Sequence, residues 1–120
     1  MIFCYAGISG WPSMSPRGSV YVYDEMTLAF WCRPTSSGTV QGIVADPRVA
    51  LHFRDTPTRT TLELQGFARI VEDRAVRERI YESIPEIERR HDLEQVGTAV
   101  LVDVQVLRGT TPDGPVLMER

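Results

Sequence analysis

Residues 10–19 (Gly-Trp-Pro-Ser-Met-Ser-Pro-Arg-Gly-Ser) combine hydrogen-bond donors with a restricted backbone. Arg17 and two serines, Ser15 and Ser19, supply the donors. They flank Gly18, where the backbone can approach a ligand closely because glycine has no side chain. The two prolines lower the entropy cost of fixing the segment. We therefore interpret the segment as a candidate ligand contact, with a decorated strand edge as the alternative.

A second polar segment, residues 33–39 (Arg-Pro-Thr-Ser-Ser-Gly-Thr), follows an apolar run and precedes a candidate short helix. Hydroxyls, a glycine and the free N–H groups of a helix start are suited to holding a phosphate. Arg33 adds a positive charge that can pair with it. The segment is not a Walker motif, since the glycine spacing and the lysine are missing. A polar connection with a hydroxyl cap is the alternative.

All thirteen basic residues are arginine. The absence of lysine excludes a Schiff-base lysine and a Walker lysine. Any anionic ligand must be held by arginine, hydroxyls or backbone N–H groups.

The composition predicts one globular domain over residues 1–120, since 42% of the residues are hydrophobic and 24% are charged. A net charge of -3 offers no basic footprint for nucleic acid. No apolar run is long enough to span a membrane, and the start of the sequence lacks the pattern of a signal peptide. We therefore expect a cytoplasmic protein that binds neither nucleic acid nor membrane.

Four side chains are potential metal ligands, but no spacing among them is typical of a zinc site, so we expect no metal. These residues are Cys4, Cys32, His52 and His91. In the cytoplasm both cysteines should be reduced.

Strand patterns dominate the sequence. The predicted strands are residues 2–6, 19–23, 27–32, 49–54, 60–72 and 98–107. Strands that follow one another directly favour antiparallel pairing, so a mainly β barrel with a few outer helices is more plausible than a doubly wound sheet. Gly66 in the middle of its strand predicts a bend or a close backbone approach. In the last strand one face is predicted to hold Val100, Val102, Val104 and Val106.

Helical patterns are fewer. Residues 74–83 follow Asp73, which is a plausible N-cap, and their apolar residues recur at helical spacing. A second short helix should end near His91, and residues 86–92 should form a solvated, salt-bridged face. Residues 39–45 are a weaker helix candidate. Residues 109–120 are expected to form a loop or an extended C-terminal arm.

In their order these segments resemble a known family. The run Gly-Trp-Pro-x-x-Ser-Pro-Arg-Gly-Ser precedes a predicted hairpin, then Thr-Leu-Ala-Phe, Ser-Gly-Thr, Asp-Pro-Arg-Val-Ala-Leu and Leu-Gln-Gly-Phe-Ala-Arg-Ile-Val-Glu-Asp. Over residues 3–108 this order resembles the pyridoxamine 5'-phosphate oxidase-like, FMN-binding split-barrel proteins, and most closely their small flavin-nucleotide-binding branch. The resemblance implies a six-stranded antiparallel split β-barrel that forms a homodimer, with FMN in clefts at the dimer interface.

The resemblance assigns cofactor-binding residues in both polar segments. The residues that match the strand beside the flavin are Ser15, Pro16, Arg17 and Gly18. The residues that match the phosphate-binding loop are Ser36, Ser37, Gly38 and Thr39. Arg17 is expected to contact the phosphate or the ring, and Arg33 to add charge. Trp11 and Trp31 are candidates to stack on the flavin, with a core or interface position as the alternative.

The sequence departs from the family pattern at two points. Many members carry a lysine eight residues before the proline of the Asp-Pro pair, and here that position is Thr39. One charge-assisted hydrogen bond is therefore lost, and Arg17 or Arg33 must compensate. Most members also have a helix before the first strand, so part of this barrel is expected to be uncovered or to be covered by a partner chain.

The sequence and the resemblance leave three alternative hypotheses for the function. The first is a dimeric FMN-binding flavoprotein, an oxidoreductase whose flavin exchanges electrons with a nicotinamide or another small-molecule substrate or electron donor. The second keeps the fold, as a non-catalytic flavin-binding module or as a binder of deazaflavin F420 or haem. The third is a small β-barrel interaction domain that binds no flavin.

Overall fold

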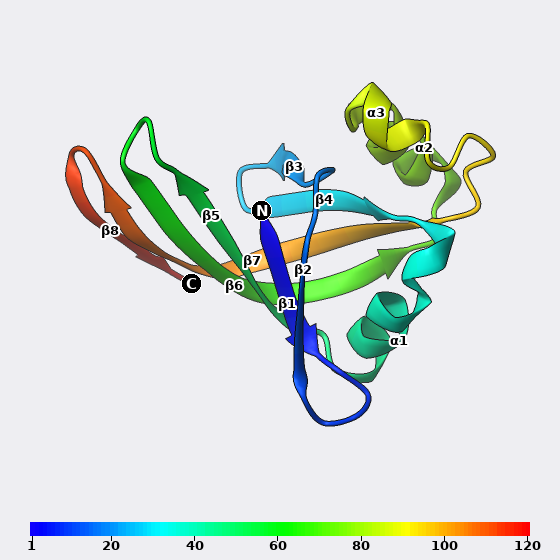
Figure 1. Cartoon of the computed structure of the whole chain (residues 1–120), viewed down its shortest axis with the longest axis horizontal. Coiled ribbons are helices and arrows are strands. Elements are labelled where there is room, and N and C mark those ends of the chain that lie inside the picture. Colours follow the sequence, from blue (N-terminus) through cyan, green and yellow to red (C-terminus); the bar gives the residue numbers. More distant parts are fainter.

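The computed structural model describes residues 1–120, half of which lie in strands (Figure 1). The strands are β1 (Ile2–Ala6), β2 (Pro12–Pro16), β3 (Tyr21–Asp24), β4 (Thr27–Cys32), β5 (Arg48–Asp55), β6 (Thr60–Val71), β7 (Thr98–Thr111) and β8 (Gly114–Glu119). The helices are α1 (Ser37–Ala45), α2 (Arg74–Ser83) and α3 (Glu86–Arg89), and a 3-10 turn, η1 (Pro34–Ser36), precedes α1.

All strands pair antiparallel in one sheet, in the order β2-β1-β5-β6-β7-β4-β3, and β8 pairs with β7. The sheet is not closed. The predicted mainly β, antiparallel split barrel is therefore confirmed. Two strands, β2 and β8, are additional to the six that the sequence predicted. Strand β2 (Pro-Ser-Met-Ser-Pro) has no β-branched or aromatic residue and β8 opens on Gly-Pro, compositions that are typical of turns.

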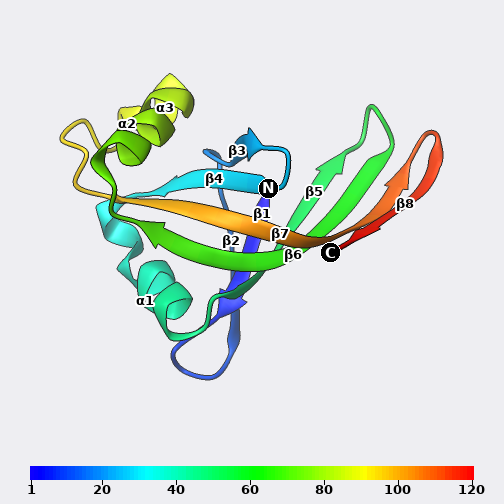
Figure 2. The ribbon, with the colours of Figure 1, turned by 180° about the vertical axis from the view of Figure 1, so that it is seen from behind.

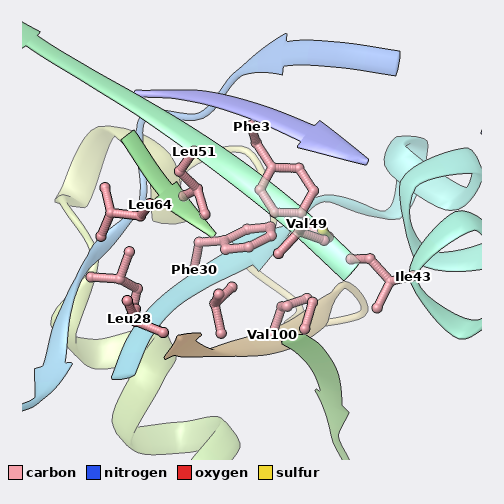
Figure 3. Close-up of a cluster of buried hydrophobic side chains, with 12 residues drawn as sticks. Phe3, Leu28, Phe30, Ile43, Val49, Leu51, Leu64 and Val100 are labelled. Carbon is pink, nitrogen blue, oxygen red and sulfur yellow. The ribbon is translucent and has the colours of Figure 1, made fainter. Parts of the chain in front are cut away.

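Inward-facing residues of the barrel form the larger hydrophobic core (Figure 3). The rings of Phe3 and Phe30 lie at its centre, with their centroids 4.9 Å apart, and both side chains are fully buried. Leu64 and Ala68 of β6 are buried in this core. Ile43 of α1 closes one end.

Gly66 marks the close approach of β6 and β7 that its position predicted. A Cβ at this residue would collide with the backbone of Asp103. The pairing of the two strands shifts register here, so that Gln105 is an extra residue in β7. Such a bulge exchanges the two faces of the strand beyond it. The prediction that Val106 shares the inner face was therefore wrong, since Leu107 packs on the core instead and Val106 lines the outer surface.

Strand β4 is buried over its whole length because both of its faces are covered. Phe30 points into the barrel, whereas Trp31 packs outward in a second core beneath α2, together with the fully buried Ile80. Helix α2 begins after the predicted N-cap, Asp73, whose carboxylate accepts a hydrogen bond from the Val76 N–H at 3.0 Å.

The helices gather at one end of the sheet, and the β5–β6 and β7–β8 hairpins project from the other (Figures 1 and 2). Residues 109–120, expected as a loop or an extended arm, complete β7 and fold back as β8. Helix α1 packs against β1, β4 and β6. None of the helices has the length and apolarity that a transmembrane helix needs.

Candidate functional site

Arg17 follows β2 directly and its side chain reaches the start of α1. Its backbone N–H donates to the carbonyl of Met1 at 2.8 Å, which extends the β1–β2 pairing. Its guanidinium carbon lies 6.0 Å from the ring centroid of Phe3 and 5.9 Å from that of Phe30. These distances are at the outer limit of a cation–π attraction. The buried rings therefore form a floor beneath the guanidinium.

The guanidinium of Arg17 binds two hydroxyls of the second polar segment. Its Nη1 donates to Ser36 Oγ at 3.3 Å and its Nη2 donates to Thr39 Oγ1 at 2.6 Å. Thr39 Oγ1 in turn donates to the Tyr5 hydroxyl at 3.4 Å. The positive charge of Arg17 thus lies directly against Thr39. Its Nε is buried without a hydrogen-bond partner.

The start of α1 faces this guanidinium. Ser36 is the N-cap residue, but its side chain makes no capping hydrogen bond and instead accepts from Arg17. The first N–H groups of a helix have no acceptor within the helix and carry its positive dipole end. Ser37 and Gly38 are exposed there, whereas Thr39 is buried beneath Arg17.

A cleft of about 410 Å³ opens beside Arg17. Its walls are formed by Pro16, Arg17, Gly18, Ser19, Trp31, Arg33, Thr35, Ser36 and Glu88. We call it the Arg17 cleft. Five of the nine predicted cofactor-binding residues line it, and four do not. Those four are Ser15, Ser37, Gly38 and Thr39. The hydroxyl of Ser15 is buried and unpaired.

Glu88 of α3 also lines the cleft, and the sequence did not predict it. Its carboxylate accepts from Arg33 Nη2 at 3.2 Å, so the cleft holds two arginines and one acid. The expectation that residues 86–92 form a solvated face was partly wrong. The ion pair of Glu86 with Arg90 is exposed, but Asp92 is buried and accepts from the Trp31 indole at 2.9 Å. This partner is distant in the sequence, so no local pattern indicated it.

No protein-family model matches the sequence, and no curated protein is similar to it. Solved structures share its fold. A pyridoxamine 5'-phosphate oxidase-related, FMN-binding protein from Nostoc punctiforme superposes with a TM-score of 0.78 at 14% identity, over 99% of this chain and 79% of that chain. The chain of residues 1–120 therefore has the split-barrel fold of the pyridoxamine 5'-phosphate oxidase-related proteins.

Two further split barrels show the same likeness. One is a Clostridium acetobutylicum protein related to general stress protein 26, from the pyridoxinephosphate oxidase family, with a TM-score of 0.77, 16% identity, and coverage of 98% of this chain and 83% of that one. The other is HupZ of Group A Streptococcus, with a TM-score of 0.75, 15% identity, and coverage of 96% and 87%. At these identities the likeness shows the fold.

The two tryptophans lie in different environments in the split barrel. Trp31 is buried, packs edge-on against Tyr81 with ring centroids 5.1 Å apart, and has the Arg77 guanidinium 5.0 Å from its ring centroid. These neighbours favour the core position over stacking on a ligand. Trp11, in the turn between β1 and β2, is 77% exposed.

The outer face of the split barrel carries a larger apolar hollow of about 550 Å³, where β1, β5, β6 and β7 meet. Cys4, Phe67 and Val106 are among its lining residues, and Phe67 is 47% exposed. Trp11 is not a lining residue, but its two neighbours in the chain, Gly10 and Pro12, line the hollow. Contiguous exposed apolar surface of this kind is typical of an interaction face.

Cys32 lies in the core close to Arg17 and is fully buried. Burial raises the pKa of its thiol to about 11, against a smaller lowering by the positive charge of Arg17. The thiolate is the reactive form of cysteine, so this side chain is chemically inert near neutral pH. No group of three or more His, Cys, Asp or Glu side chains is placed to hold a metal ion.

Proposed function

We propose that this protein binds FMN, with the phosphate held in the Arg17 cleft, and that it acts as a flavin-dependent oxidoreductase. The contact between the Arg17 guanidinium and Thr39 Oγ1, at 2.6 Å, is the observation that carries the proposal. It supplies a positive charge at the position where the family's lysine is missing. The FMN-binding split barrel of Nostoc punctiforme adds support at the level of the fold.

Arg17 has the donors that a phosphate requires. A guanidinium has five N–H donors, and the hydrogen bonds to Ser36 and Thr39 use two of them. The remaining donors include the buried, unpaired Nε. Nη1 and Nη2 each keep one N–H that the two hydrogen bonds leave unused, and these are the donors that would bind a phosphate in the cleft. Arg33 and the hydroxyl of Thr35 line the same cleft and would complete the donor set.

We further propose a homodimer, in which the apolar hollow around Phe67 is covered by a second copy of the chain. An interface of this kind would shield the exposed aromatic side chains of Trp11 and Phe67 from water. It would also supply a second wall for the flavin ring, as the resemblance implies. A monomer at micromolar concentration in light scattering would contradict this part of the proposal.

When bound, FMN supplies hydride or electron transfer, and the protein supplies binding and orientation. Arg17, Arg33 and Ser36 would hold the phosphate and fix the cofactor at one end. The proposed chemistry therefore requires no catalytic acid or base from the protein. The partner in the reaction would be a small-molecule substrate or electron donor.

The absorbance spectrum of the purified protein, with mass spectrometry of any released cofactor, tests the proposal. A flavin band with the mass of FMN is the expected result. A haem Soret band, or the mass of F420, would refute FMN and establish one of the alternatives on the same fold. A colourless protein that stays colourless after incubation with FMN would refute flavin binding altogether.

A further inference from the structure

Glu88 is the one acidic residue among those that line the Arg17 cleft. One of its carboxylate oxygens lies 3.2 Å from Arg33 Nη2. The other lies against Gly18, where an added Cβ would overlap it. The carboxylate therefore stands between Gly18 and Arg33, two residues predicted to contact the cofactor. Only 21% of the Glu88 side chain is exposed, so the charge is partly shielded from water.

The backbone of Glu88 is held in place by its neighbours. Arg89 Nη1 donates to the carbonyl of Ile84, and the Tyr81 hydroxyl donates to the carbonyl of Asp92 at 3.0 Å. These contacts fix both ends of the segment that carries α3. The side chain of Glu88 has three rotatable bonds and can swing away from Arg33 without moving the helix. The backbone of Glu88 is thus fixed, whereas its carboxylate can move.

We propose that Glu88 is an internal counter-ion of the Arg17 cleft, which the phosphate of the ligand displaces from Arg33. A carboxylate and a phosphate both accept hydrogen bonds from a guanidinium, so they compete for it. Their like charges also repel across the few ångströms that the cleft allows. The ion pair of Arg33 with Glu88 and a bound phosphate therefore compete, and each weakens the other. This inference rests on the proposed function for its ligand, and it adds a residue that sets the ligand's affinity.

The variant Glu88→Gln removes the negative charge and keeps the size of the side chain. We expect it to tighten binding of both FMN and inorganic phosphate about fivefold, from the lost ion pair and the lost repulsion. Riboflavin, which lacks the phosphate, should bind as it does to the wild type. Glu86→Gln is the matched control, because Glu86 is on the same helix, is exposed and pairs only with Arg90. It should change none of the three affinities.

Calorimetric titrations of the intact wild-type and variant proteins with FMN, riboflavin and inorganic phosphate measure the three affinities and test the inference. Weaker or unchanged FMN binding in Glu88→Gln would overturn the inference, as would an equal gain for riboflavin. In a protein that already carries Arg33→Gln, Glu88→Gln should give a smaller gain, because only the lost repulsion remains, and an undiminished gain would show that Arg33 is not the freed partner.

The same titrations distinguish failure of the inference from failure of the proposed function. If the wild type binds FMN and Glu88→Gln is unchanged, the counter-ion role of Glu88 alone is refuted. If neither protein binds FMN but Glu88→Gln binds inorganic phosphate more tightly, FMN binding is refuted and the counter-ion role stands. If neither protein binds FMN or phosphate, both are refuted.

Discussion

Replacing Arg17 with alanine should weaken FMN binding about ten- to hundredfold. The guanidinium contributes charge-assisted hydrogen bonds, which are worth about 1.5–3 kcal/mol. Arg17 has three N–H groups beyond those that bind Ser36 and Thr39, so it has donors for the phosphate. Riboflavin affinity should change less than about twofold, because the lost contact is to the phosphate alone.

Flavin fluorescence titration of the wild type and Arg17→Ala measures both affinities. Arg17 also joins β2 to α1, so circular dichroism and the melting temperature must show that the variant folds. Arg17→Lys is a second test that keeps the charge and loses the planar fork, and its FMN affinity should lie between the other two. Arg74→Ala is the control, since the Arg74 side chain is 93% exposed on α2.

The reasoning fails if Arg17→Ala folds normally and binds FMN as tightly as the wild type. It also fails if FMN and riboflavin lose affinity equally, because the effect would then be on the ring or on the fold rather than on the phosphate.

Three further predictions concern single sites. At pH 8 an alkylating reagent should leave Cys32 unmodified until the protein is unfolded, because burial raises its pKa to about 11, and rapid modification of the native thiol would contradict its burial. Phe30→Ala should reduce the free energy of unfolding in urea by about 3–5 kcal/mol, because it empties the centre of the core, and a loss under 1 kcal/mol would show a core that collapses. Hydrogen bonds from Arg48 lower the pKa of Asp46 to about 2 from 3.8, so its stabilising effect is present above pH 3.8 and is lost as the pH falls through 2. In NMR titrations the pKa of Asp46 should return toward 3.8 in Arg48→Ala, and a wild-type value near 3.8 would refute the pairing.

Local patterns were sufficient for most elements of the barrel. Strand β4 begins at Thr27 and ends at Cys32 as predicted, because its apolar run is bounded by turn residues and a proline. Helix α2 begins after Asp73 because an N-cap carboxylate satisfies a free N–H of the first turn. In both cases the residues that decide where the element begins and ends are within a few positions of it in the sequence.

The errors came from contacts between distant strands. Gly66 indicated a close approach of two strands, but the bulge at that point is on the partner strand, at Gln105. The bulge turns Val106 outward. Composition did not indicate strand β2, which depends on pairing with β1, and only the resemblance placed a strand at residues 15–18. Register and pairing are properties of two strands, and a one-residue shift exchanges their faces.

The candidate site was predicted in part. The sequence placed Arg17 and Ser36 in two separate segments, and only the resemblance joined them into one site. Their hydrogen bond at 3.3 Å follows from the packing of α1 on the barrel. Glu88 was missed because charged residues on a short helix are typical of a solvated surface, and its partner Arg33 is 55 residues away.

The affinity of the wild-type protein for FMN relative to riboflavin tests the phosphate-binding role of the Arg17 cleft most directly. Calorimetry at fixed salt concentration should give a Kd for FMN at least about tenfold lower than that for riboflavin, the smallest effect expected of one charge-assisted contact to the phosphate. Equal affinities for the two flavins, or binding of neither, would contradict the assignment of the Arg17 cleft as a flavin phosphate site.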